Sequence, residues 1–348
     1  MCNIAGYVGR EAAVPRLIDM MRREEGFAGG YYTGIATFHE GRIYTAKVVG
    51  GLDRLLAETD AAQLPGTAGI IHSRSNGGGS AAWAHPFVSN DGKLALVLNG
   101  TQGAMVPRTL SSEKAQDLDR DGVEWHAHLP QPLRGYPLLA DGSCVHFTEM
   151  FTHLTERYVQ HGKSPIDALA AAHNELPVEV VSLTLHTDEP GCILAARRNM
   201  PMMLGRAEDG MYLASTAIAF PDLPFIGIEP LPICSACTIR PDGVSMFSLD
   251  PCAIPVAQID MGMFAKAREI LLNNLQKADG PKSLSALMAE DTQALWPEGK
   301  LRQRTMLWYE TLRPLLADGT VEVSTEMVPG AAEGIETPAF RLSLRKPL

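Results

Sequence analysis

Apolar residues recur along the chain with two different periods, and each period predicts a different kind of element. A spacing of three to four residues is typical of amphipathic helices, and before residue 250 it occurs at 12–23, 145–161 and 164–176. Short alternating or continuous apolar runs are typical of strands. They occur at 3–9, 33–39, 42–49, 67–72, 94–98, 178–186, 191–197, 211–215 and 238–247. Strands, then a helix pair, then strands again predict two sheets with helices on the outside.

Residues 101–142 show little periodicity and contain four prolines. A segment of this length without a regular pattern predicts a long loop or lid, and such loops are often functional. Its Trp125, His126 and His128 could reach a ligand, but we expect them to pin the loop to the body of the protein.

The pattern of the sequence changes from about Asp260. Helical spacing returns at 263–277, 283–290 and 300–317, and two strand patterns follow at 320–325 and 339–344. We therefore predict two domains, 1–255 and 256–348, the second a small α/β unit similar to a winged helix. Acidic and basic residues are roughly balanced in the second unit, which favours docking to a protein over binding to DNA.

Composition and charge argue against several classes of protein. The chain has 348 residues, a net charge of -10 and 20% charged residues. This charge argues against general binding to nucleic acids or anionic membranes, and the sequence has no apolar run of about 20 residues that would span a bilayer. The N-terminus lacks a secretory pattern, and the six cysteines have no disulfide-framework spacing. We expect a cytoplasmic protein with reduced thiols.

Cys2 directly follows the initiator Met1, and this position carries the strongest chemical signal. Removal of Met1 would leave a thiol nucleophile and a free α-amine on one residue. An α-amine has a reference pKa near ~8, so it can act as the base for its own thiol. The competing interpretation is a small buried residue at the start of a strand.

Four other segments supply chemistry that matches such a nucleophile. Arg74 ends a strand before a glycine-rich loop, where its planar guanidinium can hold a carboxylate. Asn99 and Gly100 end another strand, where an amide and a backbone N–H can form an oxyanion hole. His85 precedes a proline, and Thr148-Glu149 opens a helix.

Together these segments resemble the class II glutamine amidotransferase domain, an N-terminal-nucleophile hydrolase. The texture is closest to the glutaminase domain of glucosamine-6-phosphate synthase, and the resemblance runs from Cys2 to about residue 249. It also includes the segments 32–36, 194–198 and 211–215. It implies an α+β fold with four layers, αββα, and hydrolysis of glutamine through a thioester on Cys2.

The resemblance also implies a role for each matched residue. Arg74 would bind the substrate α-carboxylate, and Asn99 with Gly100 would form the oxyanion hole. Gly100 would in addition line the substrate pocket, and His85 would organise the binding loop. The resemblance implies no cofactor and no metal.

Three departures from the family pattern affect the substrate site. Cys2 is followed by Asn3 rather than glycine, and the loop after Arg74 lacks the family's threonine and histidine. The family places an aspartate, which binds the substrate α-amine, where this chain has Phe147. Asp141 is the nearest acid that could replace it.

One further motif, Cys234-Ser235-Ala236-Cys237, has the two-residue gap of a metal or redox pair. One pair cannot complete a tetrahedral zinc site, and Cys252 would have to contribute. We expect a turn that leads into a buried strand.

These observations leave three functions open. The first is a glutamine amidotransferase subunit that supplies ammonia to a separate synthetase, with 256–348 as the docking element. The second is an independent amide hydrolase of the same fold, and the third is a degenerate, non-catalytic binding subunit. Glutamine or a related small amide would be the substrate in the first two.

Overall fold

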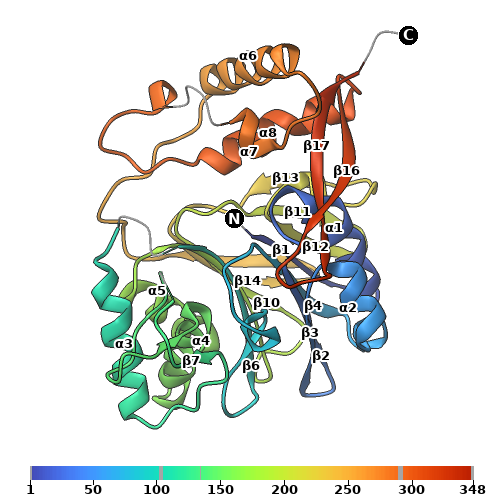
Figure 1. The fold of residues 1–348 in the computed structure, drawn as a ribbon. Coiled ribbons are helices and arrows are strands. Elements are labelled where there is room, and N and C mark those ends of the chain that lie inside the picture. The colour runs from blue at the N-terminus through green and yellow to red at the C-terminus, as the bar shows by residue number, and fades with distance from the viewer. Residues whose placement is uncertain (1, 102–104, 134, 289–292, 346–348) are drawn as a thin grey trace.

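The computed structural model describes the whole chain except residues 1, 102–104, 134, 289–292 and 346–348. Its main body is a sandwich of two antiparallel sheets with helices on both outer faces (Figure 1). The C-terminal helices lie above one end of this sandwich, and the last hairpin runs down its side (Figure 1).

The first sheet has seven strands, and β1 lies at its centre. In spatial order they are β13 (Gly227–Pro230), β11 (Met203–Ala207), β12 (Gly210–Ala214), β1 (Asn3–Gly9), β4 (Ala68–Arg74), β2 (Tyr32–His39) and β3 (Arg42–Val49). Helices α1 (Ala13–Ala28) and α2 (Leu52–Glu58) cover its outer face with an apolar layer that includes Leu17, Met21 and Leu55.

The second sheet has six strands and carries the remaining helices of the sandwich. In spatial order the strands are β15 (Gly243–Ser248), β14 (Ser235–Arg240), β10 (Ile193–Arg197), β9 (Glu179–His186), β6 (Leu94–Thr101) and β5 (Phe87–Val88). Helices α3 (Arg108–Arg120), α4 (Phe147–Gln160) and α5 (Pro165–Glu175) pack outside it.

Branched side chains fill the space between the two sheets. Ile4, Ile70 and Leu213 come from the first sheet, and Val97 and Leu183 from the second; all are fully buried or nearly so. Burial of such side chains is the main driving force that holds the layers together. The predicted four-layer αββα fold is therefore confirmed.

Two details of the expected secondary structure are wrong. Residues 101–142 are not a loop throughout, because α3 forms inside this segment and buries Ala115 and Leu118 against α4. Residues 238–247 are not one strand: the chain turns at Asp242 and continues as β15, which pairs antiparallel with β14. Pro-Asp-Gly is a strong turn sequence, and it separates the two strands.

The C-terminal part contains α6 (Met261–Lys277), α7 (Leu284–Leu287) and α8 (Arg304–Ala317), followed by the hairpin of β16 (Val321–Pro329) and β17 (Glu336–Leu344). These elements share an apolar cluster that includes Leu271, Trp308 and Leu342. The hairpin also packs on α1, where Phe340 meets the ring of Phe27 at 5.0 Å. The boundary at 255 and the winged-helix comparison remain predictions.

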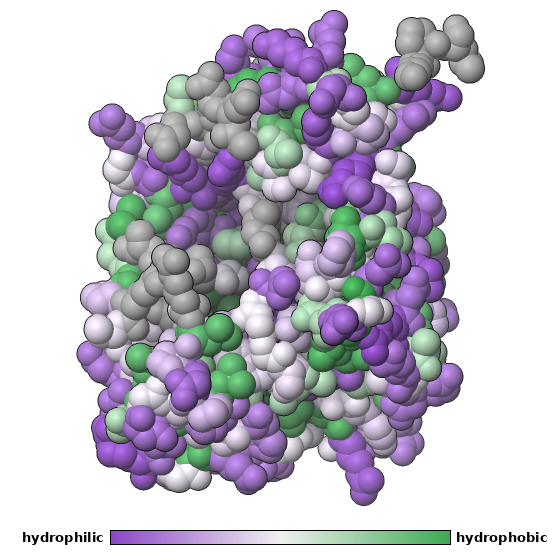
Figure 2. Space-filling view, viewed as in Figure 1, coloured by the Kyte–Doolittle hydropathy of each residue, from purple (hydrophilic) through white to green (hydrophobic). Residues whose placement is uncertain are grey.

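Figure 2 shows the surface hollowed between this upper helical part and the sandwich below it. Within the described residues, no helix is both long enough and apolar enough to cross a membrane. Two short strands complete the sandwich, β7 (His128–Leu129) and β8 (Cys144–Val145), which pair antiparallel beside the start of α4.

Candidate active site

The two sheets meet at Cys2, which immediately precedes β1. Asn99, on β6 of the second sheet, donates from Nδ2 to the carbonyl oxygen of Cys2 at 2.8 Å. The backbone nitrogen of Cys2 donates in return to Asn99 Oδ1 at 3.4 Å. Asn99 is almost fully buried, so one amide side chain fixes Cys2, at the start of a strand of one sheet, to a strand of the other. Met1 lies outside the described residues, and its removal remains a prediction.

Ser75 is the closest described polar contact of the Cys2 sulfur. Its backbone nitrogen donates to Cys2 Sγ at 3.5 Å, and its Oγ lies 3.6 Å from the same sulfur. The sequence analysis missed Ser75, although the position directly after Arg74 at the end of β4 was a usable signal. Because β1 and β4 are neighbours, with Asn3 opposite Ser73, the start of one strand lies beside the end of the other.

Cys2 opens into a pocket with a volume of about 280 Å³. Its described lining consists of Cys2, Arg74, Ser75, Gly77, His85, Leu98, Gly100, Gly135, Tyr136, His146, Phe147 and Thr148. The structure therefore brings four predicted residues together around Cys2: Arg74, His85 and Gly100 in the lining, and Asn99 against the Cys2 backbone. Tyr136, His146 and Thr148 join them without having been predicted as site residues.

Arg74 is the cation of this pocket and is held firmly in place. Its Nη1 donates to the carbonyl oxygens of Gly78 at 3.0 Å and Trp83 at 3.5 Å, and its Nη2 donates to the hydroxyl of Tyr136. The guanidinium also lies 4.6 Å from the centre of the Tyr32 ring, a distance suited to a cation–π contact. Within the part of the chain that the structure describes, these hydrogen bonds leave Nε and one Nη2 hydrogen for a ligand carboxylate.

Gly100 is a position that only glycine fits. Its φ is +142°, and a Cβ there would lie 2.2 Å from the carbonyl oxygen of Glu179. Gly100 faces Val180 across the β6–β9 pair and is exposed to the pocket, whereas Asn99 beside it is buried. The strand end thus places Gly100 in the lining of the pocket and the Asn99 amide against the Cys2 backbone.

A cluster of three buried histidines lies at the pocket, and two of them, His85 and His146, line it. The rings of His72 and His85 lie 3.7 Å apart, and His146 lies 5.3 Å from His85. Burial, followed by the charge of Arg74, lowers the pKa of His72 to about 3. Burial and the neighbouring cations likewise hold the pKa values of His85 and His146 well below their usual range.

His85 contacts the start of α4. Its Nε2 lies 2.8 Å from Thr148 Oγ1, while His146 caps the helix by accepting from the backbone nitrogen of Thr148 at 3.1 Å. This position agrees with the expectation that His85 organises the loop around the pocket, a role that remains a prediction. Among the described residues, Nδ1 of His85 and Nε2 of His146 have no hydrogen-bond partner.

The structure does not bring Asp141 into the pocket. Asp141 is exposed, and its carboxylate accepts from the backbone nitrogen of Ser143 at 2.9 Å and from the Ser143 hydroxyl at 2.5 Å. Those hydrogen bonds hold its pKa below the usual value. Phe147 does line the pocket, so the described lining contains no carboxylate.

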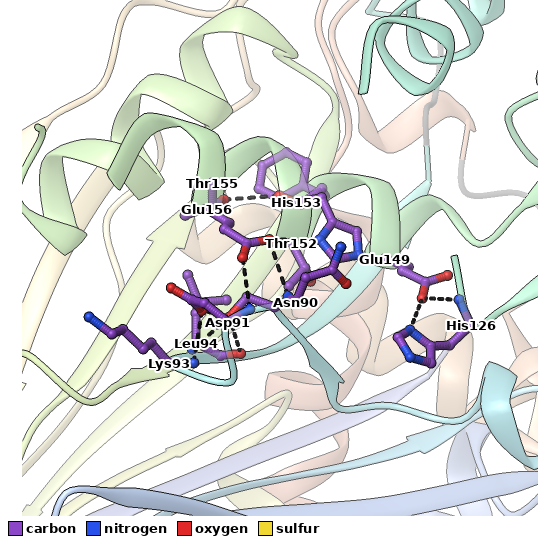
Figure 3. A network of polar contacts seen from close by, with 12 residues as sticks. Asn90, Asp91, Lys93, Leu94, His126, Glu149, Thr152, His153, Thr155 and Glu156 are labelled. Carbon is purple, nitrogen blue, oxygen red and sulfur yellow. Dashed lines mark hydrogen bonds and ion pairs between the residues drawn. The ribbon is translucent and has the colours of Figure 1, made fainter. Parts of the chain in front are cut away.

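The acid side chains of α4 hold two loops against the sandwich, as Figure 3 shows. Glu149 accepts from the backbone nitrogens of His126 at 2.8 Å and Ala127 at 2.9 Å. Glu156 does the same for Asn90 and Asp91. His126 and its neighbours therefore pin their segment to the body, as expected, and Tyr136 of the same segment reaches Arg74.

The cysteine motif at 234–237 is not a pair in space. Cys237 is fully buried between the sheets, whereas the sulfur of Cys234 lies 2.7 Å from that of Cys252. Cys234 lies in the turn before β14, with a positive φ of 53°, whereas Cys237 lies inside that strand, so the motif is a turn that leads into a buried strand, as expected. No group of three or more potential metal ligands occurs among the described residues.

Comparisons with known proteins agree with this geometry. The chain is 29% identical over 222 residues to the glutamine–fructose-6-phosphate aminotransferase (isomerizing) of Pyrococcus horikoshii, covering 63% of this chain and 33% of that protein. The same enzyme of Leifsonia xyli is 28% identical over 331 residues, covering 93% of this chain and 46% of the relative. The chain thus spans between a third and a half of the length of these curated relatives. No family model matches it.

Solved structures show the same fold. The glutamine phosphoribosylpyrophosphate amidotransferase of B. subtilis, complexed with ADP and GMP, superposes with a TM-score of 0.59 at 15% identity, covering 99% of this chain and 72% of that one. A structure described as the allosteric regulatory enzyme of purine biosynthesis has a TM-score of 0.58 at 15% identity, covering 89% and 63%. Together these likenesses support the resemblance of the chain to a class II glutamine amidotransferase domain of the N-terminal-nucleophile hydrolase type.

Proposed function

We propose that this chain hydrolyses the side-chain amide of glutamine through a thioester on Cys2 and supplies the ammonia to a separate synthetase. The observation that carries the proposal is the surroundings of the Cys2 sulfur. Ser75 contacts the sulfur, Asn99 fixes the backbone of Cys2, and Arg74 lines the same pocket of about 280 Å³. We assign the reaction to the cytoplasm, where the thiol stays reduced.

In the proposed reaction the α-amine of Cys2, freed by removal of Met1, takes the thiol proton. The sulfur attacks the amide carbon, and the oxygen of the tetrahedral intermediate receives hydrogen bonds from Asn99 Nδ2 and the Gly100 N–H. The amine then passes its proton to the departing ammonia. Water cleaves the thioester in a second cycle of the same groups and releases the acid.

Arg74 sets the orientation of the substrate in this proposal. Its free Nε and Nη2 hydrogens suit the planar α-carboxylate of glutamine. No carboxylate among the described lining residues meets the α-ammonium, so the rings of Tyr136 and Phe147 are the groups left to face it. A cation against an aromatic ring gains about 0.5–2 kcal/mol, and we therefore expect free glutamine to bind weakly to the isolated chain.

The lack of a carboxylate in the described pocket lining favours a second candidate function. This is an amide hydrolase for substrates that have a carboxylate and no ammonium group. Glutamine and an analogue that lacks the α-amine should be compared by kcat/KM, in the original chain and in Asp141→Asn. Near-equal values for the two substrates support a lost ammonium site. A strong preference for glutamine that disappears in Asp141→Asn would assign the ammonium to Asp141, and a preference that survives would reject both explanations.

The proposal as a whole is tested by ammonia release from glutamine, with and without candidate synthetase subunits. Cys2→Ala should abolish release, whereas Cys252→Ala, which removes a partly exposed thiol that does not line the pocket, should leave it intact. Release that rises when a synthetase is added supports the subunit role. Turnover retained in purified, folded Cys2→Ala would reject the mechanism, and a silent original chain that binds glutamine would favour the degenerate binding subunit.

A further inference from the structure

A second cavity, larger than the pocket of Cys2, lies between the C-terminal helices and the edge of the first sheet. Its volume is about 930 Å³, which falls in the range of roughly 300–1,000 Å³ that is typical of small-molecule sites. Strands β11 and β13 form one wall, and helices α6 and α8 form the other. It shares no lining residue with the pocket of Cys2.

Most of its wall is apolar, including at the mouth. Met203 and Met306 line the interior and are buried, whereas Ile228 of the edge strand is 37% exposed and Met261 is 81% exposed. Large apolar side chains gathered around a concave opening are a common sign of a binding site.

Two polar atoms inside the cavity wall lack partners among the described residues. These are Oε1 of Glu310 and Oγ1 of Thr311, both on α8. The other carboxylate oxygen of Glu310 is taken by Arg313, whose Nε donates to it at 2.8 Å. A buried acceptor without a donor is unfavourable, so a ligand with an N–H or O–H group would be stabilised here.

The charge of the cavity is opposite to that of the whole chain. Its lining carries three arginines and one glutamate, in a protein of net charge -10. The buried Arg197 has a structural role, since its guanidinium donates to the carbonyl oxygens of Met200 and Leu231 and to Oε1 of Gln303. Arg268 and Arg313 are exposed side chains beside the mouth, and they would attract an acidic group.

From these three features we propose that this cavity binds a small amphipathic anion. Its apolar or aromatic body would fill the space between Met203, Met306 and Phe264. An N–H or O–H group would donate to Glu310 and Thr311, and an acidic group would lie at the mouth beside Arg268 and Arg313.

The probe that matches this description is 8-anilinonaphthalene-1-sulfonate, which combines an aromatic body, one N–H donor and a sulfonate. Its fluorescence should report one saturable site per chain. Ala265→Trp places a large side chain at an exposed lining position of α6, and we expect it to raise Kd at least tenfold. Asn273→Trp adds the same side chain at an exposed position of α6 outside the cavity, and should leave Kd unchanged.

Two comparisons test the polar part of the proposal. Arg268→Glu should weaken the sulfonate probe several-fold while leaving the uncharged N-phenyl-1-naphthylamine unaffected. Glu310→Gln should weaken both probes, since both carry the N–H. Equal Kd values for Ala265→Trp and the original chain, with both folded by their thermal transitions, would overturn the site. Tighter binding of the uncharged probe would overturn the anion preference. Cys2→Ala should bind the probe normally, so this result stands apart from the proposed glutaminase.

A different observation carries a second inference, which concerns the thiols of Cys234 and Cys252. Their sulfurs lie 2.7 Å apart, closer than two unbonded sulfurs normally approach, and Arg198 Nη1 lies 3.9 Å from Cys234. The hydrogen bond from Cys252, together with Arg198, holds the pKa of the Cys234 thiol well below its usual value. Both residues are partly exposed.

We infer that Cys234 and Cys252 form a disulfide when a low-molecular-weight disulfide such as oxidised glutathione is present. The thiolate of Cys234 attacks one glutathione sulfur and releases one glutathione thiolate. Cys252 then gives up its proton, attacks Cys234 Sγ and releases the second glutathione. Two protein thiols are oxidised, and one glutathione disulfide is reduced to two thiols.

Mass spectrometry of the intact chain after equilibration with glutathione redox buffers and blocking of free thiols tests this assignment. We expect a cross-linked peptide that joins Cys234 to Cys252 and a persistent glutathione adduct on Cys234 in Cys252→Ser. Cys192, which is buried and whose pKa is raised by burial to about 11, should stay unmodified as the internal control. A glutathione adduct on Cys234 in the original chain without any cross-link would overturn the inference.

Discussion

Replacement of Gly100 by alanine probes the oxyanion hole with the smallest possible change. The new Cβ would lie 2.2 Å from the carbonyl oxygen of Glu179 and 2.8 Å from Val180 Cα. Ordinary contacts begin near 3.4 Å, so β6 and β9 must separate by about an ångström at this point. The clash is at Gly100 itself, so the strain falls on the part of β6 that carries the Gly100 N–H and Asn99.

The expected magnitudes follow from this geometry. A non-glycine residue at φ +142° costs about 1–3 kcal/mol of unfolding free energy. Displacement of an oxyanion donor lowers kcat by about 10²–10³, so we expect Gly100→Ala to lose at least about a hundredfold in kcat, with KM changed much less.

Gly92→Ala is the matched control, since Gly92 also has a positive φ, +73°, but a Cβ there meets nothing within 4 Å. Both variants should be compared by steady-state glutaminase kinetics and by urea unfolding. Gly92→Ala should lose stability without losing kcat. Wild-type kcat in folded Gly100→Ala would refute the assignment of this strand end to the oxyanion hole.

Three further predictions concern binding, proton linkage and the support of the pocket. Arg74→Ala should raise KM about tenfold or more with little change in kcat, because its contact with the substrate exists in both ground and transition states. Asn99→Ala should instead lower kcat by about 10²–10³. A shift in KM alone for both variants would contradict the assignment of Asn99 to the oxyanion hole. Burial lowers the pKa values of His72 and His173 to about 3, so the unfolded chain takes up protons below pH 6.5 that the folded chain does not. Each histidine should therefore cost about 1.4 kcal/mol of unfolding free energy per pH unit below pH 6.5. Urea unfolding at several pH values should show that the unfolding free energy of His173→Gln depends less steeply on pH. An unchanged dependence would contradict the burial argument. Glu149→Gln should loosen the 126–127 segment, and limited proteolysis should cut there faster than in the original chain; equal rates would show that Glu149 does not hold the segment.

The predicted site residues that the structure gathers at the pocket share one property: each lies at or near the end of a strand. Arg74, Asn99 and Gly100 close predicted strands, and the packing of two sheets brings those ends to Cys2. Tyr136 could not be placed in this way, because it reaches Arg74 from a segment without regular periodicity. Its position depends on tertiary contacts with Arg74, Trp83 and His146 rather than on local pattern.

The failures have equally local causes. Asp141 was the nearest acid in sequence, but its carboxylate is satisfied by Ser143 in its own turn. The turn expected at Cys234 is present before β14, but its contact with Cys252 was not foreseen, because the chain brings Cys252 back to this turn only after β15. Short-range spacing is thus a weak guide wherever a strand or turn redirects the side chains.

The central claim is that Cys2, freed of Met1, attacks a glutamine side chain. It is tested most directly by intact mass spectrometry of the purified chain before and after treatment with a diazo-ketone analogue of glutamine. The account predicts a chain that begins at Cys2 and gains one analogue-derived adduct, located on Cys2, with excess glutamine slowing the labelling and Cys2→Ala abolishing it. A chain that begins at Cys2 yet stays unlabelled, or one that is labelled equally in Cys2→Ala, would contradict the account.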